Sequence, residues 1–233
     1  MRLRLAVGVL LCGLWPVHSV SAQAVDPNLA REVAAVQNAV ALNSAALRQY
    51  TWTEHTEVLV DGEVKSSRVA TCRYDGSGKL IKTPVGDPAE KKRVSANSNN
   101  PRVRKKAAME DYIERSISLI HYYVPPKPEQ IQSLVRNGSA SLGQSQDGKP
   151  QIRFEHYFQA GDSLVLIYDP TSKELLRGSI GSTLGSPKDP VTLDAVFETL
   201  PDGVNHLASA TLNATRKKVQ VRMRNDTYQK AAN

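Results

Sequence analysis

The chain has 233 residues, a formal net charge of +7 and a hydrophobic content of 40%, which is enough to bury a core. Aromatic residues make up 6%, and there are 14 Gly and 13 Pro, so collagen-like and low-complexity classes are excluded. Two Cys residues exclude a disulfide scaffold. The composition is therefore that of a globular protein, and the length predicts one or two domains.

Residues 1–24 have the pattern of a secretory signal peptide. Two Arg residues precede an apolar run that ends at Trp15, which is too short to span a bilayer. Small residues follow, and both Ala22 and Ala24 complete a small-x-small cleavage pattern. We therefore expect a periplasmic or secreted protein that is cleaved after Ala22 or Ala24.

Basic residues gather in one segment, 90–106, which contains seven basic residues and one acidic residue. Nucleic-acid binding is not expected, because it needs basic residues spread over a face together with aromatic residues or a known module. Two interpretations remain: a contact with anionic membrane lipid, or a solvated linker followed by a helix start. The candidate membrane-contact residues are Lys91, Lys92, Arg93, Arg102, Arg104, Lys105 and Lys106.

The predicted elements begin with a helix whose start is marked by the capping pair Asp26-Pro27. Asp61-Gly62 between two β-branched runs is a strong hairpin signal. Residues 84–100 are rich in Pro, Gly, Ser and Asn, and we expect them to form a mobile basic loop. In chain order the predictions are helix 27–48, strands 50–60, 63–74 and 79–83, helices 101–124 and 128–137, and strands 139–144, 151–158, 163–169, 174–182, 191–199, 204–213 and 217–227.

The regular spacing of short strands after residue 139 is typical of an antiparallel meander and not of parallel βαβ units. The fold class that satisfies this order is α+β. We expect a strongly curved antiparallel sheet, or unclosed β-barrel, of about ten strands with three helices packed on one face. Short turns mark no boundary within it, so residues 25–233 are predicted to form a single α+β domain.

Motifs that carry chemistry are missing from the sequence. It contains no HExxH, CxxC or Gly-x-Ser-x-Gly pattern, and no two histidines after residue 24 have ligand spacing. The run from Gly76 to Lys79 lacks the spacing of a phosphate loop and reads as a hairpin turn. Cys72, the one cysteine after residue 24, is expected to be buried in a strand. The sequence predicts no catalytic residue, no metal site and no cofactor.

Four short segments carry a resemblance to known proteins: Tyr50-Thr51-Trp52-Thr53-Glu54, Gly62-Glu63-Val64, Arg73-Tyr74-Asp75 and Gly78-Lys79-Leu80. They look like a group of uncharacterised secreted bacterial proteins. The element order of amphipathic helix, hairpin, helical segment and long meander behind a signal peptide also resembles the periplasmic lipoprotein carriers of the LolA type. The resemblance covers most of the mature chain at the level of topology. It implies a non-enzymatic protein that holds an acyl chain, and it assigns no residue a role.

Three functions are therefore considered. The first is a periplasmic binding protein that carries or senses a lipid or lipoprotein acyl chain. The second is a structural or protein-interaction domain of the envelope, and the third is a secreted hydrolase built around His55 or His156 with a carboxylate. For the first, the residues expected to line an apolar cavity between helices and sheet are Val33, Val36, Val40, Trp52, Ile113, Ile117, Ile120, Leu164, Leu166, Phe197 and Val221.

Overall fold

The computed structural model describes residues 26–86 and 100–231. The expected signal peptide and most of the expected mobile loop, including Lys91, Lys92 and Arg93, lie outside the described residues. The division of the chain into a signal peptide and one domain from residue 25 stays a prediction.

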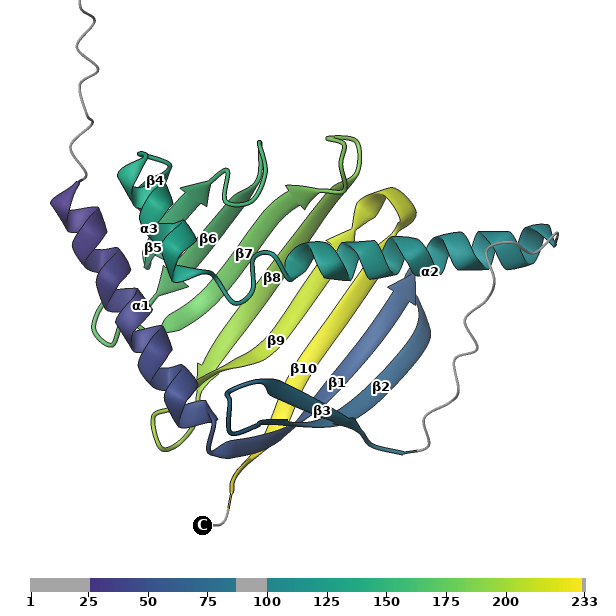
Figure 1. Cartoon of the computed structure of the whole chain (residues 1–233), viewed down its shortest axis with the longest axis horizontal. Coiled ribbons are helices and arrows are strands. Elements are labelled where there is room, and N and C mark those ends of the chain that lie inside the picture. The colour runs from purple at the N-terminus through teal and green to yellow at the C-terminus, as the bar shows by residue number, and fades with distance from the viewer. Residues whose placement is uncertain (1–25, 87–99, 232–233) are drawn as a thin grey trace, which may run out of the picture.

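The described residues form three α-helices, ten strands and one short 3₁₀ helix (Figure 1). Each element predicted from the sequence is found within a few residues of its expected bounds. In chain order they are α1 (Pro27–Leu47), β1 (Tyr50–Val60), β2 (Glu63–Tyr74), β3 (Leu80–Pro84), α2 (Pro101–Ile120), α3 (Pro128–Arg136), β4 (Ala140–Gln144), β5 (Pro150–Glu155), β6 (Ser163–Tyr168), β7 (Leu175–Thr183), β8 (Pro190–Thr199), β9 (Asn205–Ala214), η1 (Thr215–Lys217) and β10 (Val219–Lys230).

All strands belong to one antiparallel sheet with the order β3-β2-β1-β10-β9-β8-β7-β6-β5-β4. The first long strand pairs with the last, from Tyr50 opposite Lys230 to Val60 opposite Val219. The two end strands of this order, β3 and β4, are not paired with each other, so the sheet is not closed. The structure thus confirms the α+β fold with an unclosed, ten-stranded antiparallel sheet.

Local sequence signals explain the turns and caps. Asp61 and Gly62 both have positive φ, at 53° and 82°, which is the geometry that a two-residue hairpin turn between right-twisted strands requires. At the start of α1 the Asp26 carboxylate accepts a hydrogen bond from the backbone N–H of Asn28 at 2.9 Å. Pro27 fills the first helical position, where its missing N–H costs nothing.

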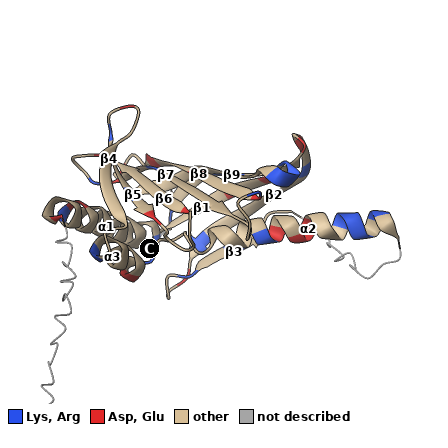
Figure 2. Ribbon diagram, turned by 90° about the horizontal axis from the view of Figure 1, so that it is seen from above, with Lys and Arg blue, Asp and Glu red and all other residues tan. Residues whose placement is uncertain are grey.

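The sheet is strongly curved because its strand pairs contain irregularities. Register shifts occur in β1 between Thr51 and Thr53, and also in the β1–β2, β6–β7 and β8–β9 pairs. Such bulges bend a strand and increase its twist. As a result β3 turns back toward the side on which the helices lie, as both views show (Figures 1 and 2).

The helices lie on the concave side of the sheet, and the strand order explains why a helical connection crosses a face. β4 is the next strand after β3 along the chain, but the two strands occupy opposite edges of the sheet. The connection between them must therefore cross a face of the sheet. It crosses as α2 and α3, and α2 runs across the strands instead of along them (Figure 1). Buried side chains of all three helices and of strands β5 to β10 form one apolar core. No helix within residues 26–86 and 100–231 is long and apolar enough to cross a membrane.

The first helix is fastened to the sheet by a carboxylate. Glu32 accepts hydrogen bonds from the Tyr168 hydroxyl at 3.0 Å and from the Lys173 ammonium at 2.8 Å. The bond from Lys173 lowers the pKa of Glu32. Burial and the bond to Glu32 raise the pKa of Tyr168 to about 12, so the phenol stays neutral at physiological pH and donates.

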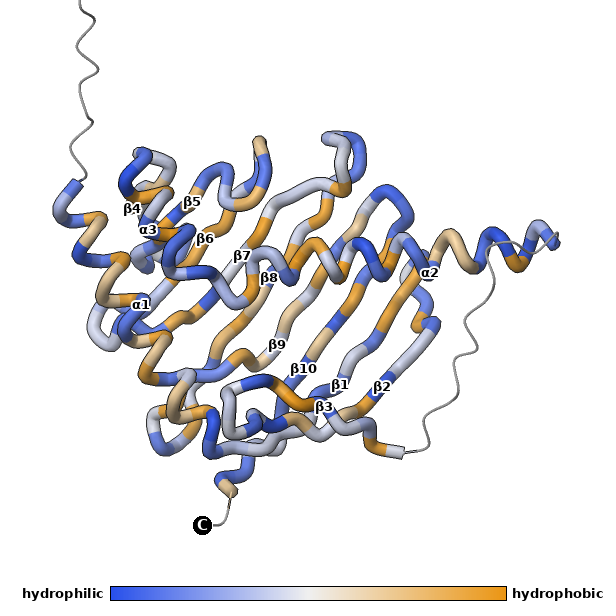
Figure 3. The backbone as a smooth tube through the Cα atoms, viewed as in Figure 1, coloured by the Kyte–Doolittle hydropathy of each residue, from blue (hydrophilic) through white to orange (hydrophobic). Residues whose placement is uncertain are grey.

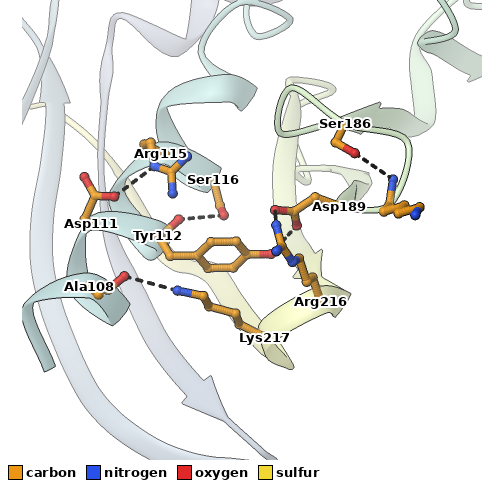
Figure 4. Close-up of polar contacts among 10 residues, drawn as sticks. Ala108, Asp111, Tyr112, Arg115, Ser116, Ser186, Asp189, Arg216 and Lys217 are labelled. Atoms are coloured by element: carbon orange, nitrogen blue, oxygen red, sulfur yellow. Dashed lines mark hydrogen bonds and ion pairs between the residues drawn. The ribbon is translucent and has the colours of Figure 1, made fainter. Parts of the chain in front are cut away.

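The second helix has a similar attachment, shown in Figure 4. The Tyr112 hydroxyl donates to Asp189, before β8, at 2.6 Å, and both side chains are almost fully buried. Arg216, in η1, pairs with the other carboxylate oxygen at 3.2 Å. Lys217 adds a cation over the Tyr112 ring and a bond from its ammonium group to the Ala108 carbonyl at 3.4 Å. Burial and the bond to Asp189 raise the pKa of Tyr112 to about 12.

Candidate functional site

The helices cover part of the concave face of the sheet. Ten of the eleven expected lining residues lie there: five are buried, and five are partly buried and packed against the same core. Val33 and Val36 come from α1, Ile120 from α2, and Leu164 and Leu166 from β6. The partly buried members are Val40, Ile113, Ile117, Phe197 and Val221.

The same face continues along β10 and β1 from Val221, which packs against the helix-covered core but is only partly buried. Val58 lies opposite Val221, and Thr56 lies opposite Met223, so these four side chains share a face with the core. All four are only half-buried. Hydrophobic and hydrophilic positions alternate over the first half of β10 (Figure 3), from Val219 to Arg224, which gives this stretch one apolar face and one polar face. We call Val58, Val221 and Met223 the apolar strip.

The remaining expected residue, Trp52, does not join the helix-covered core. It belongs to a second group, which we call the aromatic cluster: Tyr50, Trp52, Tyr74, His206 and Tyr228. The Trp52 ring stacks on Tyr228 with centroids 5.6 Å apart, and the His206 ring lies 4.2 Å from that of Tyr228. The eleven residues expected to line one apolar cavity are thus divided between the helix-covered core and the separate aromatic cluster.

The aromatic cluster is bordered by an ion pair. The Lys82 ammonium lies 2.7 Å from both oxygens of Glu54, whose side chain is 10% exposed. Cys72 is fully buried beside them, opposite Trp52 in the β1–β2 register, and burial raises the pKa of its thiol. A thiol with a raised pKa is a weak nucleophile, which agrees with the structural role expected for this cysteine.

The turn between β2 and β3 closes over this end of the sheet. Gly78, in the turn, has a φ of +84° and lies against the Arg48 guanidinium from the end of α1. A Cβ at Gly78 would come within 2.7 Å of Arg48 Nη2. The positive φ favours glycine at this position, and any side chain here would also push the Arg48 guanidinium aside, so the run from Gly76 to Lys79 is a hairpin turn, as the sequence predicts.

Two shallow surface hollows lie outside the concave face. One, of about 290 Å³, is between the C-terminal half of α1 and the turns before β7 and β9. The other, of about 270 Å³, is at the β1–β2 turn and the β9–β10 connection. Residues of the apolar strip and of the aromatic cluster line neither hollow.

A basic end forms where α2 extends beyond the sheet (Figure 2). Arg102, Arg104, Lys105 and Lys106 are all exposed on the first turns of this helix. η1 adds Arg216 and Lys217 beside the same helix. The sequence showed the first group as a charge cluster, but only the fold brings η1 to it.

The histidines named for a hydrolase are not placed in the concave face. His55 faces Asp226 at 3.4 Å, with both side chains about one-third exposed. His55 alternates with Glu54 along β1 and therefore points to the opposite, outer face. His156 Nδ1 accepts a hydrogen bond from the Gly161 N–H in a turn. Within the described part of the chain, no group of three or more His, Cys, Asp and Glu side chains is arranged to hold a metal ion.

Sequence reasoning missed the aromatic cluster and the tyrosine–carboxylate attachments. Tyr112 and Asp189 are 77 residues apart, and their pairing has no local signal. The one available hint was the concentration of Tyr, Trp and His in β1 and at the ends of β2, β9 and β10, because residues on adjacent strands meet when the register allows it.

No known protein family and no curated protein matches this sequence. Three solved structures are similar in fold. A DUF1329 family protein from Desulfovibrio piger is 13% identical, with 84% of this chain and 92% of that chain covered and a TM-score of 0.43. A domain described as outer membrane lipoprotein-sorting, from Vibrio parahaemolyticus, is 10% identical, with 87% and 93% covered and a TM-score of 0.45.

A LolA superfamily protein from Nitrosomonas europaea is 8% identical, with 85% of this chain and 94% of that chain covered and a TM-score of 0.39. The LolA-type resemblance expected from the sequence is thus found again among solved structures, as a likeness of fold alone. The roles of residues in this chain are argued below from its own geometry.

Proposed function

We propose that this protein binds the acyl chain of a lipid or lipoprotein in the periplasm and carries or senses it without catalysing a reaction. The observation that supports this proposal is the apolar strip, where Val58, Val221 and Met223 continue the core face along β1 and β10 and stay partly exposed. The periplasmic location is supported by the signal-peptide pattern of residues 1–24.

The apolar strip gives an acyl chain a place to lie without a charged anchor. Each CH₂ group that leaves water contributes about 0.8 kcal/mol to binding. Met223 adds adaptability, because its unbranched side chain adjusts to irregular apolar partners. Ile113 and Ile117 of α2 are partly buried against the same core, so a chain on the strip would reach the underside of this helix.

The proposal predicts that Val221→Lys weakens the binding of a fluorescent long-chain fatty acid about tenfold or more, because a charge then lies on the apolar strip. Gln220→Lys is the matched control, since Gln220 is the neighbouring residue and points to the other face. Binding is measured by fluorescence titration, with circular dichroism to confirm that each variant folds. Val221→Phe fills the same space without a charge and should also weaken binding.

Unchanged affinity in folded Val221→Lys and Val221→Phe would contradict the proposal. Failure of the unmodified protein to bind fatty acid, monoacylglycerol or a solubilised lipoprotein would favour the envelope interaction domain instead. A hydrolase would release product from an acyl ester during the same titration, so chromatography of the recovered ligand tests that alternative directly.

The basic end fits a second part of the same function, a contact with the anionic surface of a membrane that supplies or receives the ligand. Juxtamembrane basic residues contribute about 1 kcal/mol each near an anionic surface. Replacing Arg104 and Lys105 by Glu is therefore predicted to lower binding to vesicles containing anionic lipid by tenfold or more, with little change for neutral vesicles. Co-sedimentation at two salt concentrations measures this, and equal binding of variant and unmodified protein would show that the basic end is only a solvated helix start.

A further inference from the structure

Three buried polar atoms at the aromatic cluster have no hydrogen-bond partner among the described residues. They are Trp52 Nε1, His206 Nδ1 and Asn225 Oδ1. Trp52 and His206 are each only 6% exposed, so bulk solvent does not reach these atoms freely. A buried polar group without a partner costs about 1–3 kcal/mol, so three in one place call for an explanation.

Tyr228 is a common neighbour of the three side chains that carry these atoms. Its ring stacks on Trp52 and contacts His206, with centroid distances of 5.6 Å and 4.2 Å. Its hydroxyl donates to the Leu207 carbonyl at 3.2 Å, and the Asn225 amide donates to that same carbonyl at 3.0 Å. Trp52, His206 and Asn225 are thus all immediate neighbours of one residue.

The cluster is also continuous with the apolar strip. Asn225 is two residues from Met223 on β10, on the same face of the strand, and lies opposite Glu54 of β1. The concave face of β1 carries every second side chain of the strand, namely Trp52, Glu54, Thr56 and Val58. An extended ligand on the apolar strip with one end toward Asn225 would therefore have that end beside the aromatic cluster, past the Glu54–Lys82 ion pair.

The chemistry of the three atoms defines the ligand. The indole N–H only donates, the Asn carbonyl oxygen only accepts, and the His nitrogen can do either. A hydroxyl group satisfies both kinds of atom, because it donates and accepts. The neighbouring charges of Glu54 and Lys82 compensate each other, so nothing in this pair favours a charged headgroup.

We infer that Trp52, His206 and Asn225 form a binding site for the neutral, hydroxyl-bearing headgroup of an acylated ligand, of which a monoacylglycerol is the simplest example. This inference rests on the proposed acyl-chain binding and assigns the polar end of its ligand. Aromatic rings beside hydrogen-bonding groups suit such a headgroup, because its C–H faces pack on the rings while its hydroxyls bond to the side chains.

The test compares three probes with the same acyl chain: a monoacylglycerol, the methyl ester and the free fatty acid. The monoacylglycerol should bind about tenfold tighter than the methyl ester, since each hydrogen bond contributes about 1 kcal/mol. Trp52→Phe and Asn225→Leu should each reduce this ratio severalfold. Tyr50→Phe is the control within the cluster, because the Tyr50 hydroxyl already contacts Asp202.

Trp52 also provides a direct signal. The chain contains two Trp residues, and Trp15 lies in the expected signal peptide, so the mature protein is expected to carry Trp52 as its sole tryptophan. In the mature protein the monoacylglycerol should shift the Trp52 emission, and the methyl ester should shift it less. His206→Phe keeps the reporter and should reduce the difference.

The outcomes separate the two proposals. If none of the probes binds, acyl-chain binding itself fails. If all bind but the monoacylglycerol and the methyl ester bind equally, the headgroup site is wrong and water satisfies the three atoms. A preference for the fatty-acid anion would also overturn the inference and would point to Arg48 at the β2–β3 turn.

Discussion

Asp162→Ala should lower the free energy of unfolding by about 3 kcal/mol, because the carboxylate is buried and three donors lose their acceptor with it. Asp162 is 1% exposed. Its Oδ2 atom accepts from the Tyr123 hydroxyl and from the backbone N–H groups of Phe158 at 3.0 Å and Gln159 at 2.7 Å. This one side chain therefore joins the segment after α2 to the β5–β6 loop.

The contacts around Asp162 extend to a third element. The Tyr123 hydroxyl lies 2.8 Å from Ser182 Oγ in β7, and the Gln159 amide donates to the same oxygen at 2.9 Å. Tyr123 is fully buried, and burial together with the bond to Asp162 raises the pKa of its hydroxyl. Loss of Asp162 consequently removes the carboxylate acceptor of a buried phenol, which keeps only its contact with Ser182 Oγ.

Chemical denaturation of the unmodified protein and of Asp162→Ala measures the difference in their free energies of unfolding. Asp147→Ala is the matched control, since Asp147 is an exposed turn residue whose carboxylate bonds to nearby Ser145. We expect the control to change the free energy of unfolding by less than about 0.5 kcal/mol. A loss below about 1 kcal/mol for Asp162→Ala would show that the loop rearranges to satisfy its donors elsewhere.

The fold could be predicted because its elements carry local signals. The Asp26-Pro27 pair and the Asp61-Gly62 turn act through neighbouring residues, and the structure places the helix start and the hairpin at these positions. Alternation along β10 likewise places Val219 and Val221 on the core face. Periodicity of this kind depends only on the geometry of one element.

The candidate site could be predicted only in part, because its contacts are non-local. The β10 partner of Trp52 depends on a register shift between Thr51 and Thr53, and that partner, Tyr228, comes from the far end of the chain. Single-strand patterns contain no information about such shifts. The sequence therefore offered Trp52 as a candidate lining residue but grouped it with the helix-covered core, from which the structure separates it.

Asp189→Ala should release α2 from the sheet, because the Tyr112 hydroxyl loses its carboxylate acceptor while it stays buried. We expect the free energy of opening α2 to fall by about 3 kcal/mol, which corresponds to about a hundredfold faster amide exchange for the helix. Hydrogen exchange of residues 105–116 measures this. Asp194→Ala is the matched control, since Asp194 is exposed on β8.

The same attachment should respond to alkaline pH. The pKa of Tyr112 is raised to about 12 in the folded protein, above its ordinary value of 10.0. A raised pKa means that the neutral phenol contributes stability that is fully present below pH 10 and is lost as the pH rises through about 12. Tyr112→Phe should remove that part of the alkaline transition, whereas Tyr122→Phe, at an exposed position, should not.

Release of α2 has a functional consequence if an acyl chain lies beneath it. Ile113 and Ile117 face the core from this helix, so a bound chain would leave only when the helix moves away from the sheet. Asp189→Ala is therefore expected to raise the dissociation rate of a fluorescent fatty acid by tenfold or more in stopped-flow displacement, because opening costs about 3 kcal/mol less. An unchanged dissociation rate in a variant whose α2 exchanges faster would show that the ligand lies on the apolar strip alone, outside the cover of the helix.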